Sequence, residues 1–241
     1  MSKRVSLFVT CIVDQVFPHV GLAIADVLEG LGYQVEFPQS QTCCGQPAFN
    51  SGFWEDAKGV ARHFLDTFEG SDYIVAASGS CTAMCGHHFA DLFSGDAAML
   101  ERVHRLEARV FEFSRFLLEV AKVEDLGARF EHTVTYHDSC HALRELGIKA
   151  GPRRLLSKVK GLTLKEMDIA EECCGFGGTF SVKFPDVSGG MAKTKVDSIV
   201  KTGATHVVSI DSSCLMQLQG TILRAGLPLK TMHLAEVLAS K

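Results

Sequence analysis

Short apolar runs alternate with amphipathic stretches along the chain. Continuous runs such as VSLFVT and IVAA are typical of strands buried in a parallel sheet. Helical spacing follows such runs over residues 20–31, which end at Gly32, and over residues 54–68. Further strands are expected at YQVEFP and RVFEF, and further helices over residues 100–106 and in SRFLLEVA. Alternating strand and helix predicts an α/β fold with parallel sheets and right-handed crossovers.

The second half of the chain repeats this pattern. Its expected strands are TVTYH, TLKEM, HVVSI and LKTMH, each followed by a helix-like stretch. The segment YIVAASGSC matches HVVSIDSSC, and VFEFSRFLLEV loosely matches TMHLAEVLAS. An internal duplication therefore predicts two tandem domains, residues 1–126 and 127–241, each a small parallel sheet flanked by helices.

Eight of the nine cysteines repeat in the same order. They are Cys11, Cys43, Cys44, Cys81, Cys140, Cys173, Cys174 and Cys214. In both halves the second and third form a Cys-Cys-Gly step, with 31 or 32 residues between the first cysteine and this pair and 36 or 39 between the pair and the last cysteine. Each position is expected just after a strand, and such loops gather at the carboxyl edge of an α/β sheet. Four sulfurs should therefore converge in each half.

Four convergent thiolates fit either an iron–sulfur cluster or a structural zinc ion. Zinc sites usually present Cys-x2–4-Cys knuckles, whereas here two ligands are adjacent and the others stand on separate loops. Adjacent side chains in extended backbone diverge, which favours a cluster of several irons. We expect up to one cluster per domain, of the [4Fe-4S] type, with zinc as the alternative occupant; a buried vicinal disulfide or plain packing cysteines are the remaining interpretations.

Composition narrows the remaining classes of function. The net charge of −4 and a pI near 6.2 give no reason to expect nucleic acid as a partner. No apolar run reaches the ~18–20 residues of a membrane span, and Asp14 and Gln15 interrupt the apolar run near the start. We expect a cytoplasmic protein. There is no flavin or nicotinamide fingerprint and no nucleophile–base set, so catalytic residues stay unassigned.

Several long motifs carry a family resemblance. The segments SLFVTCIVD, CCGQPAFNSG, SGSCTAM, CCGFGGTFSVK and HLAEVL resemble the cysteine-rich CCG-domain family, and within it the lactate utilization protein A family. Other members of the wider family include the cysteine-rich subunit of heterodisulfide reductase and the iron–sulfur subunits of glycolate oxidase and anaerobic glycerol-3-phosphate dehydrogenase.

The resemblance implies an oxidoreductase subunit that transfers electrons within a complex oxidising L-lactate to pyruvate. Its partners would be a ferredoxin-like iron–sulfur subunit and a third small subunit. The resemblance also implies that the first four repeated cysteines bind one cluster and the last four another.

One departure from the family pattern limits what can be carried over. The family repeat ends in Cys-x-x-Cys, but the first of those cysteines is Ser78 in one half and Asp211 in the other. Asp211 is either an oxygen ligand or, as we expect, an N-terminal helix cap. Four cysteines suffice for an ordinary cubane, so electron transfer is favoured over the thiol–disulfide chemistry of heterodisulfide reductase. A zinc-binding structural module is the third hypothesis.

Other polar and sulfur groups lie close to the repeated cysteines. Cys85 follows Cys81 by one helical turn and is expected on a helix face, the alternative being a fifth sulfur ligand. His87 and His88 are expected on a solvated helix face.

The HDSCH segment around Cys140 has two interpretations. His137, Asp138 and His141 form either a proton relay or, as we favour, hydrogen bonds that tune the second cluster. The glycines of CCGFGG are expected to let the backbone approach the cluster closely.

Overall fold

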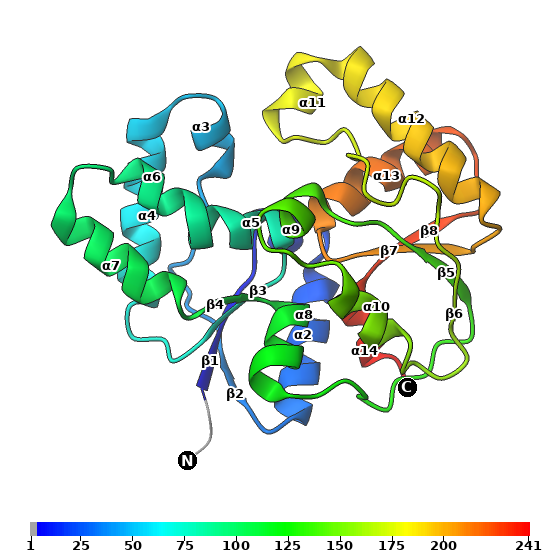
Figure 1. The fold of residues 1–241 in the computed structure, drawn as a ribbon, viewed down its shortest axis with the longest axis horizontal. Helices are drawn as coiled ribbons and strands as arrows, with labels where there is room; N and C mark the ends of the chain where they lie inside the picture. The colour runs from blue at the N-terminus through cyan, green and yellow to red at the C-terminus, as the bar shows by residue number, and fades with distance from the viewer. Residues whose placement is uncertain (1–3) are drawn as a thin grey trace.

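The computed structural model describes residues 4–241 and contains two four-stranded parallel sheets (Figure 1). The first has the order β2-β1-β3-β4 and the second β6-β5-β7-β8, so both halves share one topology. The strands of the first sheet are β1 (Arg4–Phe8), β2 (Gln34–Glu36), β3 (Ile74–Ala76) and β4 (Val110–Glu112). Those of the second are β5 (Thr133–Tyr136), β6 (Thr163–Leu164), β7 (His206–Ser209) and β8 (Lys230–His233). The expected duplicated α/β architecture is confirmed.

Helices connect all the strands. The first half contains α1 (Cys11–Val16), α2 (Pro18–Gly30), α3 (Gln46–Asn50), α4 (Trp54–Phe68), α5 (Gly79–Ala83), α6 (Phe89–Leu92), α7 (Ala97–Glu107) and α8 (Phe113–Phe116), with π-helical turns at Met84–His88 and Leu117–Ala121. The second contains α9 (Cys140–Arg144), α10 (Ala150–Leu156), α11 (Thr179–Lys183), α12 (Pro185–Lys201), α13 (Ser212–Arg224) and α14 (Leu234–Ala239). Helix α4 has the bounds that its apolar spacing predicts, and it buries Ala57, Ala61, Phe64, Leu65 and Phe68 on one face.

The two halves share a hydrophobic core. The largest cluster of buried apolar side chains takes residues from both sheets and includes Leu28 of α2 and Leu238 of α14, helices that pack against each other. The halves also meet at α5 and α9, where a Cβ on Gly79 would lie 2.6 Å from the Cβ of Ala142. Each half keeps a smaller core of its own, around Phe64 in the first and Val196 in the second. This shared packing brings the carboxyl edges of the two sheets toward each other.

Across residues 4–241, no helix combines the length and the apolar character that crossing a bilayer requires.

Candidate metal centre

The repeated cysteines occupy matching places in the two halves. Cys11 and Cys140 are the first residues of α1 and α9, and Cys81 and Cys214 lie in the first turns of α5 and α13. Peptide N–H groups and the positive end of the helix dipole favour a thiolate in such a position. All four therefore stand in the first turn of a helix that follows a strand, as the strand–loop pattern indicates.

The two Cys-Cys pairs lie farther from their strands than expected. After β2 and β6 the chain runs on through residues 37–42 and 165–172 before it reaches Cys43 and Cys173. In the first half Gln41 folds this segment back onto β1: its side-chain amide donates to the Leu7 carbonyl at 3.1 Å, and its oxygen accepts from the Val9 N–H at 2.8 Å. The expectation that the pairs follow their strands directly is wrong, because a returning loop is inserted before each pair.

All eight repeated cysteines line a single cavity between the halves. We expect four sulfurs to converge in each half. The two groups of four do so, and both open into this common cavity. Polar side chains from both halves complete the lining, among them Gln46, Ser80, Ser139 and Asp211. Gly177 and Gly178 also line it with positive φ angles, so the CCGFGG backbone does approach the site closely.

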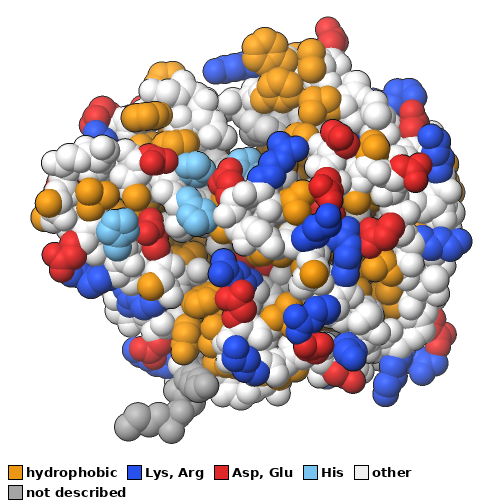
Figure 2. All heavy atoms as spheres, in the orientation of Figure 1, with side chains coloured by type: hydrophobic (Ala, Val, Ile, Leu, Met, Phe, Trp, Pro, Cys, Tyr) orange, Lys and Arg blue, Asp and Glu red, His pale blue; other side chains and the backbone are white. Residues whose placement is uncertain are grey.

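One side of this cavity is lined by Gln46, Pro47 and Asn50 of α3 and by Phe176, Gly177 and Gly178, which precede α11. Directly beside the helices, the hydroxyls of Ser51 and Thr179 lie 3.1 Å apart and link the two halves. Figure 2 shows apolar side chains gathered over α11 and the start of α12, where Val182, Phe184 and Val187 are exposed. Exposed apolar side chains therefore follow in sequence after residues 176–178 of the cavity lining.

The sulfurs within each group touch one another without forming disulfides. The Sγ atoms of Cys11 and Cys43 are 3.7 Å apart, those of Cys174 and Cys214 are 3.1 Å apart, and all nine cysteines are free thiols. A disulfide requires an S–S distance near 2.05 Å. These contacts are the spacing of donor atoms that converge on a common centre.

The electrostatics of the two groups are also alike. The pKa of Cys43 lies far below its ordinary value, mainly because Cys11 donates a hydrogen bond to its sulfur. The pKa of Cys173 is lowered in the same way by a hydrogen bond from Cys140. The pKa values of Cys11 and Cys140 are raised in turn by the same hydrogen bonds and by burial. One thiolate per group is thus favoured, while the hydrogen bond and burial keep Cys11 and Cys140 protonated. A bound cation would allow all four thiols to ionise, so the donor set fits a metal or an iron–sulfur cluster.

A backbone N–H supports each favoured thiolate. Gly45 donates to the sulfur of Cys43 at 3.4 Å, and Gly175 donates to that of Cys173 at 3.3 Å. Both glycines are left-handed, with φ of 85° and 86°. A residue with a side chain adopts this conformation with strain, which explains the glycine of the Cys-Cys-Gly step.

The residues at the missing fifth-cysteine positions face each other across the interface. Ser78 donates to Asp211 Oδ2 at 3.1 Å, and the same oxygen accepts from the N–H of Ser80 at 2.8 Å and the hydroxyl of Ser139 at 3.3 Å. Asp211 caps α13 by accepting from Ser213 N–H, which confirms the expected helix cap. Burial raises the pKa of Asp211, but these hydrogen bonds outweigh it and lower the pKa overall. Oδ2 of Asp211 therefore joins the halves, while Oδ1 caps α13.

The residues of HDSCH have separate roles. Asp138 is buried in a bidentate ion pair with Arg153, with both N–O distances 2.8 Å. His141 places Nδ1 3.5 Å from the Cys140 sulfur, which is the kind of tuning contact that the sequence favours, and its Nε2 is 3.8 Å from Glu145. No hydrogen bond joins Asp138 to His137 or His141 among residues 4–241, so the segment does not act as one relay.

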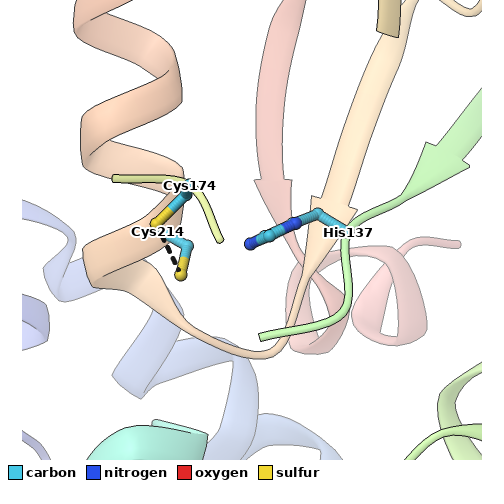
Figure 3. A group of neighbouring side chains, drawn as sticks. All are labelled: His137, Cys174 and Cys214. Atoms are coloured by element: carbon cyan, nitrogen blue, oxygen red, sulfur yellow. Dashed lines mark hydrogen bonds between the residues drawn. The ribbon is translucent and has the colours of Figure 1, made fainter. Parts of the chain in front are cut away.

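His137 is fully buried, and neither of its ring nitrogens has a hydrogen-bond partner within the described chain. Its ring lies against Cys174 and Cys214, with one donor atom from each residue within 4.8 Å of the others (Figure 3). Burial lowers the pKa of His137 to about 3, so the ring is neutral at physiological pH. An unsatisfied buried polar group costs about 1–3 kcal/mol.

One other sequence expectation is corrected. His88 is not on a solvated face: its Nε2 lies 2.9 Å from Glu145 of the other half, and its ring packs against Phe49. His87 is exposed as expected. Cys85 is fully buried in the core of the first half and, among the residues described, is not part of the cavity lining.

Lys195 is a feature that sequence reasoning missed. It is buried on α12, and its ammonium donates to the carbonyls of Ile169 and Ala170. Burial lowers its pKa, and the nearby Cys174 counteracts that shift. The signal was available, because this lysine lies between Ala192 and Ile199 on the apolar stripe of the helix. It brings a cation close to the second group of sulfurs.

Comparison with known proteins agrees with the duplicated geometry. The profile of the family described as a cysteine-rich domain, CCG, matches residues 5–86 and 134–219. Lactate utilization protein A of Bacillus cytotoxicus is 47% identical over 238 residues, which cover 99% of both chains. Lactate utilization protein A of an Exiguobacterium species is 49% identical over 237 residues, covering 98% of this chain and 96% of the relative.

A solved structure has the same fold. The crystal structure of a hypothetical protein from Helicobacter pylori matches 98% of this chain with a TM-score of 0.73 at 10% identity. This chain spans 48% of that protein, about half its length. At such identity the match extends to the fold alone.

Proposed function

The chain belongs to the cysteine-rich CCG-domain family, and from that premise we propose that it is an iron–sulfur electron-transfer subunit of a complex that oxidises L-lactate to pyruvate. The full-length similarity to lactate utilization proteins A supports the lactate pathway. The partners would be the other subunits of that complex, including a ferredoxin-like iron–sulfur protein. We propose that the complex acts in the cytoplasm.

One observation carries the proposal: two groups of four thiols face a single cavity between duplicated halves. We assign Cys11, Cys43, Cys44 and Cys81 as ligands of one cluster, and Cys140, Cys173, Cys174 and Cys214 as ligands of the other. Such clusters, when bound, supply one-electron carriers. Since both groups open into the same space, an electron could pass between them without crossing a layer of side chains.

The protein's own groups prepare the ligands. The helix N-termini and the Gly45 and Gly175 N–H groups favour thiolate at the sites where metal must bind. N–H···S hydrogen bonds also raise the reduction potential of a cluster, because they stabilise the extra negative charge of the reduced state. Burial of Cys44 and Cys174 restricts water at the inner side of each group.

Zinc is a second candidate occupant, and one distance favours it. Two sulfurs on a tetrahedral zinc, each at about 2.3 Å from the metal, lie roughly 3.8 Å apart. The Cys11 and Cys43 sulfurs are 3.7 Å apart. The four-iron assignment requires the sulfurs of each group to separate when the cluster binds, and metal analysis distinguishes the two occupants.

Disulfide reduction is the less favoured redox chemistry. Ser78 and Asp211 stand where the family pattern has a fifth cysteine, and both are used in hydrogen bonds between the halves. Neither residue supplies a fifth sulfur. Simple electron transfer through four-cysteine sites agrees better with this arrangement.

The proposal is tested by isolating the complex anaerobically through a tag on this chain. L-Lactate, added without other reductant, should produce pyruvate and the paramagnetic resonance signal of a reduced cluster. The matched control is the same complex carrying Cys81→Ala and Cys214→Ala, one substitution in each group. An unreduced spectrum in a complex that still forms pyruvate would overturn the electron-transfer role.

A further inference from the structure

The structure assigns His137 to the second cysteine group as a fifth donor: we propose that its imidazole coordinates the metal held by Cys140, Cys173, Cys174 and Cys214. This inference rests on the proposed function for the nature of the group, but its argument comes from the geometry around the ring. It would make the two sites chemically different, although their cysteines repeat.

The position of His137 points it at the sulfurs. It is the first residue after β5, at the carboxyl edge of the second sheet. Its N–H donates to the Val208 carbonyl at 2.9 Å, and its carbonyl accepts from the Ser209 hydroxyl at 3.0 Å. The backbone is thus fixed to β7, and Figure 3 shows the ring extending from it toward Cys174 and Cys214.

Among the described residues the Ala170 carbonyl acts on the ring, but it lies outside normal hydrogen-bond geometry. Both nitrogens are buried and without a hydrogen-bond partner, and a donor atom lies within 4.8 Å of both sulfurs. A neutral imidazole in such a place offers a lone pair, which is what a metal ligand requires. The pairing of imidazole with thiolates is common to zinc and to iron–sulfur sites, so the assignment does not depend on which metal is present.

The other candidate for a fifth donor is already occupied. Asp211 stands at the position of the missing cysteine, but its oxygens accept from Ser80, Ser139 and other donors at the interface. His137 approaches the same group of sulfurs from the loop that follows β5. It therefore supplies the donor that the second half lacks in its terminal motif.

The first half has no equivalent of this imidazole. The matching position, three residues before Cys11, is Phe8, whose side chain is fully buried in the core of the first half. An apolar side chain cannot coordinate a metal. The first site is thus left with sulfur ligands, and the second has mixed sulfur and nitrogen ligands. Because the ligands of a cluster set its reduction potential, the two sites should have different midpoint potentials.

Pulsed paramagnetic resonance on protein with ¹⁵N-labelled histidine tests the assignment. The reduced wild-type chain, prepared anaerobically, should give a strongly coupled histidine nitrogen. His137→Ala should abolish that coupling, and His137→Cys should replace it with a sulfur ligand and shift one of the two midpoint potentials. The control is His206→Asn, which removes another buried histidine, at the start of β7 and the opposite end of the same sheet.

The two proposals fail in different ways. If the chain contains iron and sulfide but shows no strongly coupled nitrogen, the assignment of His137 is overturned and the iron–sulfur function stands. The same holds if the nitrogen coupling persists in His137→Ala. A chain without iron or sulfide would overturn the iron–sulfur function. The same nitrogen coupling is then measured on the chain loaded with Co²⁺. A coupling that is present in wild type and lost in His137→Ala supports His137 as a ligand. No coupling in wild type excludes His137 as a ligand.

Discussion

At the scale of single residues, two cysteines one helical turn apart have different roles: one is a proposed ligand and the other is a core side chain. Cys81 lies in the first turn of α5 and lines the cavity, whereas Cys85 lies one turn later in a π-helical segment and packs in the core. Burial raises the pKa of Cys85, which keeps it a neutral thiol. The duplication separates them in the sequence, because Cys81 matches Cys214 whereas the position that matches Cys85 is Leu218, and the packing agrees with that difference.

This difference predicts opposite effects of two small substitutions. Cys81→Ala should remove a ligand and reduce the iron content of the chain to about half, since one of two clusters is lost. Cys85→Ala should keep full iron content and cost only about 1 kcal/mol of stability through a small cavity. Iron and sulfide analysis of both anaerobically purified variants checks this. Equal losses in the two variants would place Cys85 among the ligands.

Glu112 is a second residue whose environment makes a measurable prediction. It is fully buried at the N-cap of α8, where it accepts from the N–H groups of Ser114 and Arg115. Burial raises the pKa of its carboxyl from 4.5 to about 7 despite these hydrogen bonds. The folded chain therefore retains a proton that the unfolded chain has already lost between these two pH values.

The stability contributed by Glu112 should fall as the pH rises from about 4.5 to about 7, and then level off. The size of the effect is about 3 kcal/mol, because each unit of pKa shift corresponds to about 1.4 kcal/mol. Glu112→Gln retains an oxygen acceptor for the cap but cannot ionise. The difference in melting temperature between variant and wild type, measured from pH 4.5 to 8, should grow in favour of the variant. A constant difference would contradict the raised pKa.

At the scale of elements, the Cys-Cys-Gly turn leaves little room for a side chain on its glycine. A Cβ at Gly175 would lie 2.6 Å from the backbone oxygen of Ser188 in α12, and φ is already left-handed. At Gly45 the nearest atom is the side chain of Val60, at 3.3 Å. Backbone cannot yield as a side chain does, so the second turn is the less tolerant of the two.

Alanine substitutions should follow that order. Gly203→Ala, also at a left-handed position but with no atom within 4 Å, should cost about 1–2 kcal/mol from backbone strain alone. Gly175→Ala adds a clash and should cost more, with loss of metal from the second group. Gly45→Ala should lie between them. Melting temperatures and metal content rank the three; a Gly175→Ala chain as stable as Gly203→Ala would show that the turn relaxes freely.

The elements also show how far sequence patterns reach. Long amphipathic stretches such as residues 54–68 are recognisable because their apolar spacing persists over several turns. Short helices such as α1 and α9 are missed, since six or fewer residues carry no readable period. The returning loop before Cys43 is missed because it depends on hydrogen bonds from one side chain, that of Gln41.

At the scale of the whole molecule, the single cavity is the feature that the sequence could not predict. Repeated cysteines indicate two similar sites, but how the halves face each other depends on contacts between distant residues. The α2–α14 packing, the close approach of Gly79 to Ala142 and the Ser78–Asp211 hydrogen bond set that orientation. His137 and Lys195 then make the two groups unequal, which cysteine spacing alone cannot reveal.

The central claim is that each group of four cysteines holds a cluster, and the most direct test is the iron and acid-labile sulfide content of anaerobically prepared chain. Two four-iron clusters predict about eight irons and about eight sulfides per chain. Exchange of both Cys44 and Cys174 for alanine should bring both values close to zero. Stoichiometric zinc with no sulfide in the wild-type chain would contradict the account.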